Sequence, residues 1–114
     1  ELEERRKRLE NLDEKARKKE EQLIRVAEKA KTIDFGTLGV ASASEADDLQ
    51  KIKGIGPFIA EKLNALGIYK FSQLANMTSE IEEEVNVAIE FFSGRIKRDE
   101  WAKQARNIIG GEEE

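Results

Sequence analysis

The sequence predicts an all-α protein in which a long N-terminal helix precedes a compact bundle of about five short helices. Three observations support this fold class. The first 32 residues contain no Gly or Pro and place apolar residues at heptad spacing. A Gly-Ile-Gly-Pro turn at 54–57 separates two short segments with apolar patterning. No stretch alternates apolar and polar residues as a half-buried strand does.

Residues 1–32 are expected to form one coiled-coil helix. All five heptad a positions and three of the five d positions are apolar, which is typical of a coiled-coil seam. An amphipathic helix of this length needs a partner for its apolar stripe. A homodimer through residues 1–32, another protein and the module that follows all remain possible partners, and a solvated spacer helix is the alternative. The a positions are Leu2, Leu9, Ala16, Leu23 and Ala30, and the d positions are Arg5, Leu12, Lys19, Val26 and Ile33.

The remainder divides into a linker at 33–44, a helical module at 45–110 and a tail at 111–114 that we expect to be disordered. The linker contains two Gly residues and almost no charge, although Phe35, Leu38 and Val40 are too apolar to be wholly solvated. Helices of the module are expected at 45–51, 57–66, 71–76, 79–91 and 100–109. The predicted core contains Leu49, Ile52, Ile55, Ile59, Leu63, Leu66, Ile68, Phe71, Leu74, Val85, Ile89, Phe92, Ile96, Trp101, Ala105 and Ile108.

Composition excludes several classes of function. The 114 residues include no Cys and no His, so there is no disulfide framework, no thiol-based metal site and no histidine base. We therefore expect no enzyme activity, no cofactor and no metal centre. No run is long and apolar enough to cross a bilayer. We expect a cytoplasmic location without membrane contact, and because the chain starts without Met we expect a fragment whose parent could carry an anchor upstream.

The first candidate site is the Gly-Ile-Gly turn. The amides of Gly54, Ile55 and Gly56 are expected to be free at a helix N-terminus, where an anion such as phosphate can bind, with Lys53 and Lys62 supplying positive charge. The alternative is that the glycines only make the turn. Net charge favours the alternative, since residues 45–114 hold 9 Lys and Arg against 14 Asp and Glu.

The second candidate site is the basic segment Arg95, Lys97 and Arg98, whose side chains could contact phosphate. Its alternative is charge pairing with Asp99, Glu100 or the acidic helix that starts near residue 79. The glutamates at 80–84 are interpreted as a solvated face rather than a metal site, because neighbours on one helix point in different directions. Trp101 is interpreted as a core residue.

The turn and its flanks also resemble a known family. Ile52-x-Gly54-Ile55-Gly56-x-x-x-Ala60-x-x-Leu63 is similar to the helix-hairpin-helix motif of DNA repair, recombination and replication proteins. The stretch of about 47–108 looks like a small module that bacteria append to otherwise unrelated proteins. The resemblance implies that the hairpin binds rather than catalyses, and that backbone carbonyls of Gln50, Ile52 and Ile55 hold a monovalent cation. The loop at 93–96 keeps only one glycine, so a second phosphate cradle is not implied.

From these features we expect a non-enzymatic module that binds duplex DNA independently of sequence through backbone phosphates. Pairing through the N-terminal coil would add avidity. A protein–protein adaptor that retains the hairpin only for stability is the alternative, and a fold that only positions a larger upstream protein is a third possibility.

Overall fold

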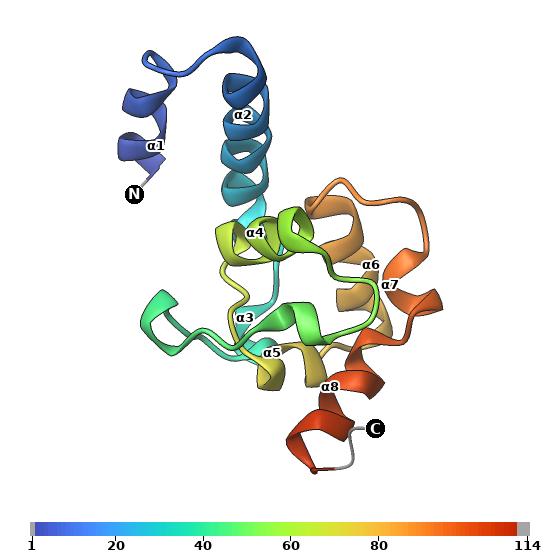
Figure 1. Ribbon diagram of the computed structural model, residues 1–114. Coiled ribbons are helices and arrows are strands. Elements are labelled where there is room, and N and C mark those ends of the chain that lie inside the picture. The colour runs from blue at the N-terminus through green and yellow to red at the C-terminus, as the bar shows by residue number, and fades with distance from the viewer. Residues whose placement is uncertain (1, 112–114) are drawn as a thin grey trace.

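The computed structural model describes residues 2–111, and every regular element among them is a helix (Figure 1). Glu1 and residues 112–114 lie outside the described part, and so does most of the tail predicted to be disordered. The α-helices are α1 Leu2–Leu9, α2 Glu14–Glu28, α3 Phe35–Leu38, α4 Pro57–Leu66, α5 Phe71–Ala75, α6 Ser79–Ala88, α7 Arg95–Arg98 and α8 Trp101–Ile109. Three 3-10 turns, η1 Lys29–Thr32, η2 Ala43–Glu45 and η3 Leu49–Lys51, complete the described structure.

The N-terminal segment is a helical hairpin, so the expectation of one coiled-coil helix over residues 1–32 is wrong. α1 and α2 lie side by side and project from the rest of the molecule as an arm (Figure 1). The break has a local cause, because the Asp13 carboxylate accepts the Ala16 amide at 2.8 Å and caps a new helix. Ion pairs from Arg5 to Glu20, at 2.8 Å, and from Arg6 to Glu28 join the two antiparallel helices.

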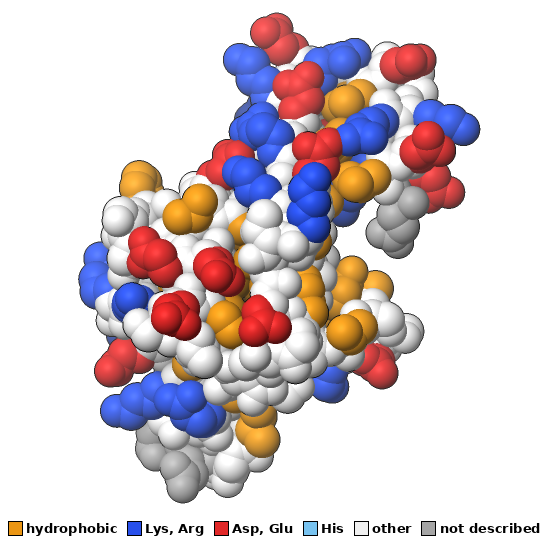
Figure 2. Space-filling view, turned by 180° about the vertical axis from the view of Figure 1, so that it is seen from behind, with side chains coloured by type: hydrophobic (Ala, Val, Ile, Leu, Met, Phe, Trp, Pro, Cys, Tyr) orange, Lys and Arg blue, Asp and Glu red, His pale blue; other side chains and the backbone are white. Residues whose placement is uncertain are grey.

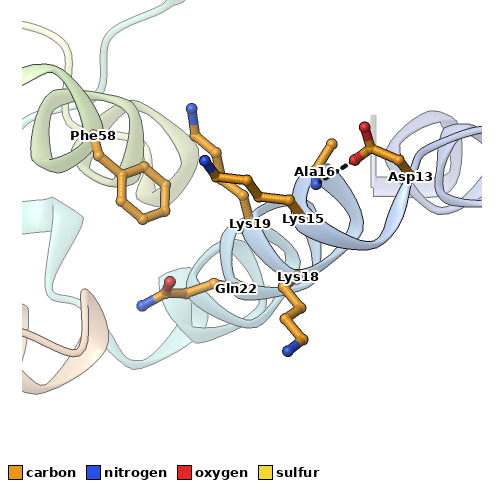
Figure 3. Close-up of a pocket in the computed structure, with 7 residues that line it drawn as sticks. All are labelled: Asp13, Lys15, Ala16, Lys18, Lys19, Gln22 and Phe58. Carbon is orange, nitrogen blue, oxygen red and sulfur yellow. Dashed lines mark hydrogen bonds between the residues drawn. The ribbon is translucent and has the colours of Figure 1, made fainter.

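The part of the apolar stripe that lies on α2 is buried within the same chain. Leu23 and Val26 of α2 are buried, and α2 packs along α4 of the helical body. Nearer the N-terminal end of α2, Lys15 and Lys19 extend toward the Phe58 ring on α4 (Figure 3). The heptad pattern left open which partner covers this stripe. In the structure, the helical module that follows the arm packs against it.

Glu90 fastens the arm to the end of α6. Its carboxylate accepts hydrogen bonds from Arg25 at 2.9 and 3.0 Å and from Gln22 at 3.0 Å, and Lys29 lies at 3.6 Å. The hydrogen bonds from Arg25 are the main reason why the pKa of Glu90 falls to about 2, although burial opposes the shift. Glu90 adopts a left-handed conformation with φ 56°, which costs a non-glycine residue backbone energy. The ion-pair cluster holds it there.

Acid is expected to weaken this attachment. Because the pKa of Glu90 is lower in the folded than in the unfolded chain, its contribution is present above its ordinary pKa and is lost as pH falls toward about 2. The cluster is partly solvated, so we expect a contribution of about 1 kcal/mol. The measurement compares the free energy of unfolding of wild type and Glu90→Gln between about pH 7 and about pH 3. Their difference should shrink on acidification. Exposed Glu84→Gln is the control, and a difference independent of pH would contradict the assignment.

The body is built around one apolar core, and most of its predicted members are confirmed. Trp101, Leu63 and Ile68 are fully buried. Phe92 is the exception, with 73% of its surface exposed, so its prediction as a core residue is wrong. Residues outside the predicted set also enter the core, and two of them, Ile33 and Leu38, come from the segment interpreted as a linker. The other additions are Val26, Met77, Ile81, Ala88 and Ala102.

Helix boundaries follow local capping where a cap is present. α4 spans the predicted 57–66 and ends at Gly67, whose φ of 112° lets its amide bond the Leu63 and Asn64 carbonyls. The helix expected at 45–51 is instead the two turns η2 and η3. α6 ends at Ala88, three residues before the predicted end. α7 was not predicted at all.

Charged side chains are unevenly distributed over the surface. Figure 2 shows closely mixed basic and acidic side chains on the arm and a group of acidic side chains on one face of the body. The acidic helix α6 carries Glu80, Glu82, Glu83 and Glu84. None of the helices within residues 2–111 combines the length and the apolar character that a membrane span requires.

Candidate functional site at the helical hairpin

The Gly-Ile-Gly turn links η3 to α4 as the motif predicts. Gly54 has φ 106°, a conformation that residues with a side chain rarely adopt. Gly56 is the N-cap of α4 in an extended conformation, and Pro57 occupies the first helical position. The helix-hairpin-helix geometry expected from these residues is therefore present, and what remains is whether its amides are free.

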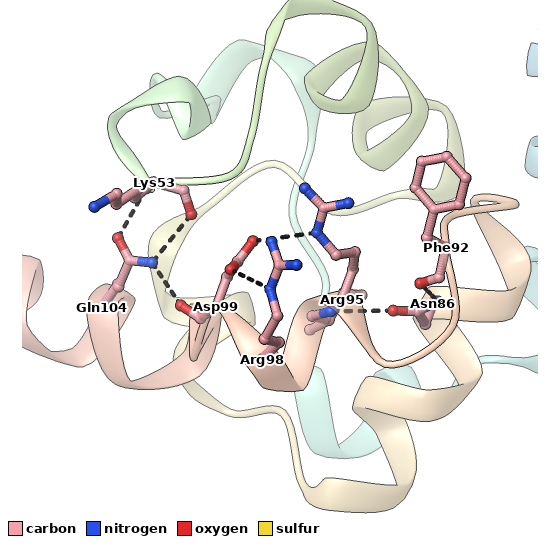
Figure 4. A network of polar contacts seen from close by, with 8 residues as sticks. Lys53, Asn86, Phe92, Arg95, Arg98, Asp99 and Gln104 are labelled. Carbon is pink, nitrogen blue, oxygen red and sulfur yellow. Dashed lines mark hydrogen bonds and ion pairs between the residues drawn. The ribbon is translucent and has the colours of Figure 1, made fainter.

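The backbone of the hairpin is partly engaged within the chain, at Lys53 and Ile55. Gln104 of α8 closes the turn from across the body, because its side-chain oxygen accepts the Lys53 amide at 2.8 Å and its side-chain nitrogen donates to the Lys53 carbonyl at 3.1 Å (Figure 4). The Ile55 amide donates to the Ile52 carbonyl at 3.1 Å. The Ile55 amide that we expected to meet a phosphate thus already has an acceptor, and so does its neighbour at Lys53.

An acidic side chain covers the remaining part of the turn. A Cβ atom built on Gly54 would lie 2.6 Å from a carboxylate oxygen of Asp99 and 3.0 Å from the indole nitrogen of Trp101. The carboxylate therefore rests against the glycine and repels a phosphate placed there. Of the two glycines of the turn, Gly56 is the one with open space around it. Gln104 and Asp99 thus contact the hairpin from the C-terminal part of the body, and this arrangement argues against the predicted cradle of Gly54, Ile55 and Gly56.

Lys62 is not available to a ligand at the hairpin. Only 5% of its surface is exposed, and its ammonium group donates to the Ile89 carbonyl at 3.0 Å. It also lies over the Phe58 ring, 4.8 Å from the centroid. Burial lowers the pKa of Lys62, although the negative charge of Glu90 opposes the shift. The side chain thus joins α4 to the end of α6.

The basic segment at 95–98 is paired with carboxylates. Asp99 lies 3.8 Å from Arg95 and 3.1 Å from Arg98 (Figure 4). Lys97 lies 3.9 Å from Glu83 on α6. The charge-pairing alternative describes this geometry better than free cations do. Of the eight predicted contact residues, the side chains of Lys53, Lys97 and Arg98 remain exposed.

Asn86 is a structural residue that sequence reasoning missed. It is 4% exposed, donates to the Phe91 and Phe92 carbonyls at 3.3 and 2.8 Å, and accepts the Ile96 amide at 3.1 Å. These bonds hold the loop at 91–96 so that Phe92 faces outward (Figure 4). The guanidinium of Arg95 lies 5.8 Å from the Phe92 ring centroid. The sequence did hold a signal for this role, because Asn86 is a polar residue on the apolar face of α6.

The carbonyls proposed for a cation are also partly occupied. Ile52 uses its carbonyl to accept the Ile55 amide, and Gln50 is exposed on η3. Across residues 2–111 there is no group of three Asp or Glu side chains arranged to hold a metal ion.

Comparison with known proteins gives one family match. The model described as "RS2/RL21/YNQ2 HHH domain" matches residues 49–109, which is more than half of the chain. No solved structure matches significantly.

Three curated relatives illustrate where this module occurs. Small ribosomal subunit protein uS2 of Methylobacterium radiotolerans is 42% identical over 84 residues, 74% of this chain and 23% of that protein. Large ribosomal subunit protein bL21 of Hyphomonas neptunium is 39% identical over 71 residues, 59% of this chain and 32% of that protein. A Paracoccus denitrificans protein named "Uncharacterized 22.9 kDa protein in nqo2 3'region" is 38% identical over 71 residues, 62% of this chain and 33% of that protein. The chain thus spans at most about a third of these relatives.

The names of these relatives contradict the expected partner, which was duplex DNA. Relatives called ribosomal proteins do not fit a module for sequence-independent binding of duplex DNA, so that expectation is wrong, and so is the link to DNA repair. The protein–protein adaptor that the sequence left open gains no support from the names either. The family resemblance itself, to helix-hairpin-helix domains, is confirmed.

Proposed function

Because the chain belongs to the RS2/RL21/YNQ2 HHH domain family, we propose that it is a non-enzymatic module that associates with the ribosome by contacting ribosomal RNA. The observation that carries the proposal is that one helical unit occurs in proteins named for the small and for the large ribosomal subunit. Two ribosomal proteins with different names share this unit. Both ribosomal subunits expose RNA at their surfaces, so RNA is a partner that the unit could contact on either one. On this proposal the module works in the cytoplasm.

The geometry supports a module that presents a surface rather than one that performs a reaction. The sequence contains no His or Cys, the residue types most often used as base or nucleophile. The glycine turn is engaged by Gln104 and Asp99, so it fixes the relative positions of η3, α4 and α8. We propose that contact with RNA comes from side chains displayed on this rigid frame. The exposed Lys53 supplies a secondary phosphate contact, and Lys97 and Arg98 do so by exchanging Glu83 and Asp99 for phosphate.

Cosedimentation with purified ribosomal subunits tests the proposal. At low salt the chain should pellet with subunits, and the bound fraction should fall steeply as salt rises, because phosphate contacts release counterions. A duplex DNA competitor should displace the chain less effectively than ribosomal RNA. If the chain stays in the supernatant with both subunits and with free ribosomal RNA at low salt, the proposal is wrong. The double variant Lys53→Gln with Arg98→Gln should weaken binding by a small factor. In a plot of the logarithm of the binding constant against the logarithm of the salt concentration, it should also reduce the magnitude of the slope by about 1.4.

A further inference from the structure

A groove between the arm and the body has the chemistry of a nucleotide-binding surface. It lies between α2 and the start of α4, has a volume of about 540 Å³, and is lined by Lys15, Lys18, Lys19, Gln22 and Phe58 together with Asp13 and Ala16. Lys15, Lys19 and Gln22 are separated by four and three positions and therefore lie along one face of α2, and Lys18 lies beside that face. The groove is separate from the glycine turn, where the Lys53 and Ile55 amides are engaged within the chain.

Two of the lysines face an aromatic ring. Lys15 and Lys19 extend from α2 in parallel on the side of Phe58, whereas Lys18 leaves the helix in another direction (Figure 3). The Lys19 ammonium lies 5.1 Å from the Phe58 ring centroid, over its face. Phe58 is half-buried, with the buried Lys62 against its ring, and part of the ring stays accessible. This combination brings positive charge and an aromatic face into one groove.

The groove is not neutralised as the other basic segment is. Within residues 2–111, Lys15 and Lys18 form no ion pair, while Lys19 is paired with Glu61 at 3.2 Å. Asp13 is occupied as the cap of α2, where it accepts the Ala16 amide. Like charges one helical turn apart repel each other, so Lys15 and Lys19 leave a local excess of positive charge. An anionic ligand would relieve that repulsion.

We propose that this groove binds a single-stranded segment of RNA. A base stacks on Phe58 in place of the Lys19 ammonium, while buried Lys62 stays on the ring, and Lys19 moves to hold the adjoining phosphates together with Lys15. Lys18 lies at the far edge and attracts the continuing strand. Aromatic faces accept any base, and ammonium groups serve as point charges for phosphate, so the recognition is of unpaired RNA rather than of a sequence. The inference rests on the proposed function and names the surface that carries it. An acidic peptide would use the lysines but would gain nothing from the ring face.

Glu61 gives the proposal a distinctive consequence. Its carboxylate competes with phosphate for Lys19, and both side chains are half exposed, at 52% each. RNA must therefore displace Glu61 before Lys19 can bind a phosphate. Glu61→Gln should tighten RNA binding by about twofold or more, because it frees Lys19. A merely structural role for Lys19 would predict no gain in affinity.

The test measures fluorescence anisotropy of a labelled single-stranded RNA of mixed sequence with the full chain. Phe58→Leu should weaken binding by about fivefold or more, because it removes the stacking face and keeps an apolar side chain. Lys15→Gln with Lys19→Gln should weaken binding and reduce the salt slope by about 1.4. Lys31→Gln with Lys103→Gln makes the same change in net charge at exposed positions outside the groove, and should alter affinity less than twofold.

A second measurement does not depend on a loss of binding. Phe58→Trp places a fluorophore in the groove, and RNA should quench the added emission while leaving that of fully buried Trp101 in wild type unchanged. If wild type binds RNA but the groove variants bind equally well, the inference is overturned and the proposed function stands. If wild type binds neither RNA nor ribosomal subunits, both fall. If polyglutamate quenches the Phe58→Trp variant as strongly as RNA does, an acidic protein is the better occupant and the inference is overturned.

Discussion

Replacing Trp101 with alanine should lower the free energy of unfolding by about 3–5 kcal/mol. Trp101 begins α8, is fully buried, and packs against Phe91 with their ring centroids 5.8 Å apart. Its removal leaves a large cavity between α8 and the hairpin, which the surrounding backbone cannot fill. Because domains are commonly stable by only about 5–15 kcal/mol, this loss would remove a large share of the free energy of unfolding.

The measurement is urea denaturation followed by helical circular dichroism, because the substitution removes the tryptophan signal. Phe92→Ala is the control, since it also removes an aromatic ring, but one that is 73% exposed. It should cost less than about 1 kcal/mol. Equal losses for the two variants would show that Trp101 is not the central core residue.

Gly54→Ala should destabilise the protein by about 2–4 kcal/mol, from two additive causes. The backbone conformation with φ 106° is strained for any residue with a side chain. The new methyl group would also meet the Asp99 carboxylate at 2.6 Å and the Trp101 indole nitrogen at 3.0 Å, which forces α7 and α8 away from the turn.

Two other glycines separate these causes. Gly94→Ala imposes a positive φ of 74° in open space, so it should show backbone strain alone, about 1–2 kcal/mol. Gly56→Ala has negative φ and open space, and should change stability by less than about 0.5 kcal/mol. Adding Asp99→Ala should reduce the cost of Gly54→Ala but not that of Gly94→Ala. Equal costs at 54, 56 and 94 would contradict the close approach of Asp99.

The parts of the fold that the sequence predicted correctly are those determined by neighbouring residues. Pro57 and Gly67 limit α4 through their own backbone preferences, and both act within one turn of the helix. The all-helical class follows from the same local patterning. Predictions that depended on residues far apart in the sequence were less accurate. The heptad pattern in residues 1–32 has an apolar stripe, but Asp13 divides it, and the stripe is buried on the chain's own body.

The candidate site shows the same limit. A motif of two glycines predicts that the chain turns, but it does not predict which residues pack against the turn. Gln104 and Asp99 lie about fifty residues farther along the chain and reach the hairpin only after α8 has docked. Phe92 was predicted to be buried because it is apolar, whereas the bonds made by Asn86 turn it outward. The groove at Phe58 joins residues from two segments whose packing no local pattern reveals.

The bridge between Lys53 and Gln104 also bears on the order in which the protein acquires its structure. The two residues are separated by 51 positions, so the backbone groups of Lys53 cannot form these bonds until nearly all of the polypeptide is available. Closing so long a loop costs entropy before any contact is gained. During synthesis the arm and α4 can form early, while the glycine turn stays incomplete until the last helix arrives. A nascent chain stalled before α8 would hold the turn through the local bond between Ile55 and Ile52, without the two bonds from Gln104 to Lys53.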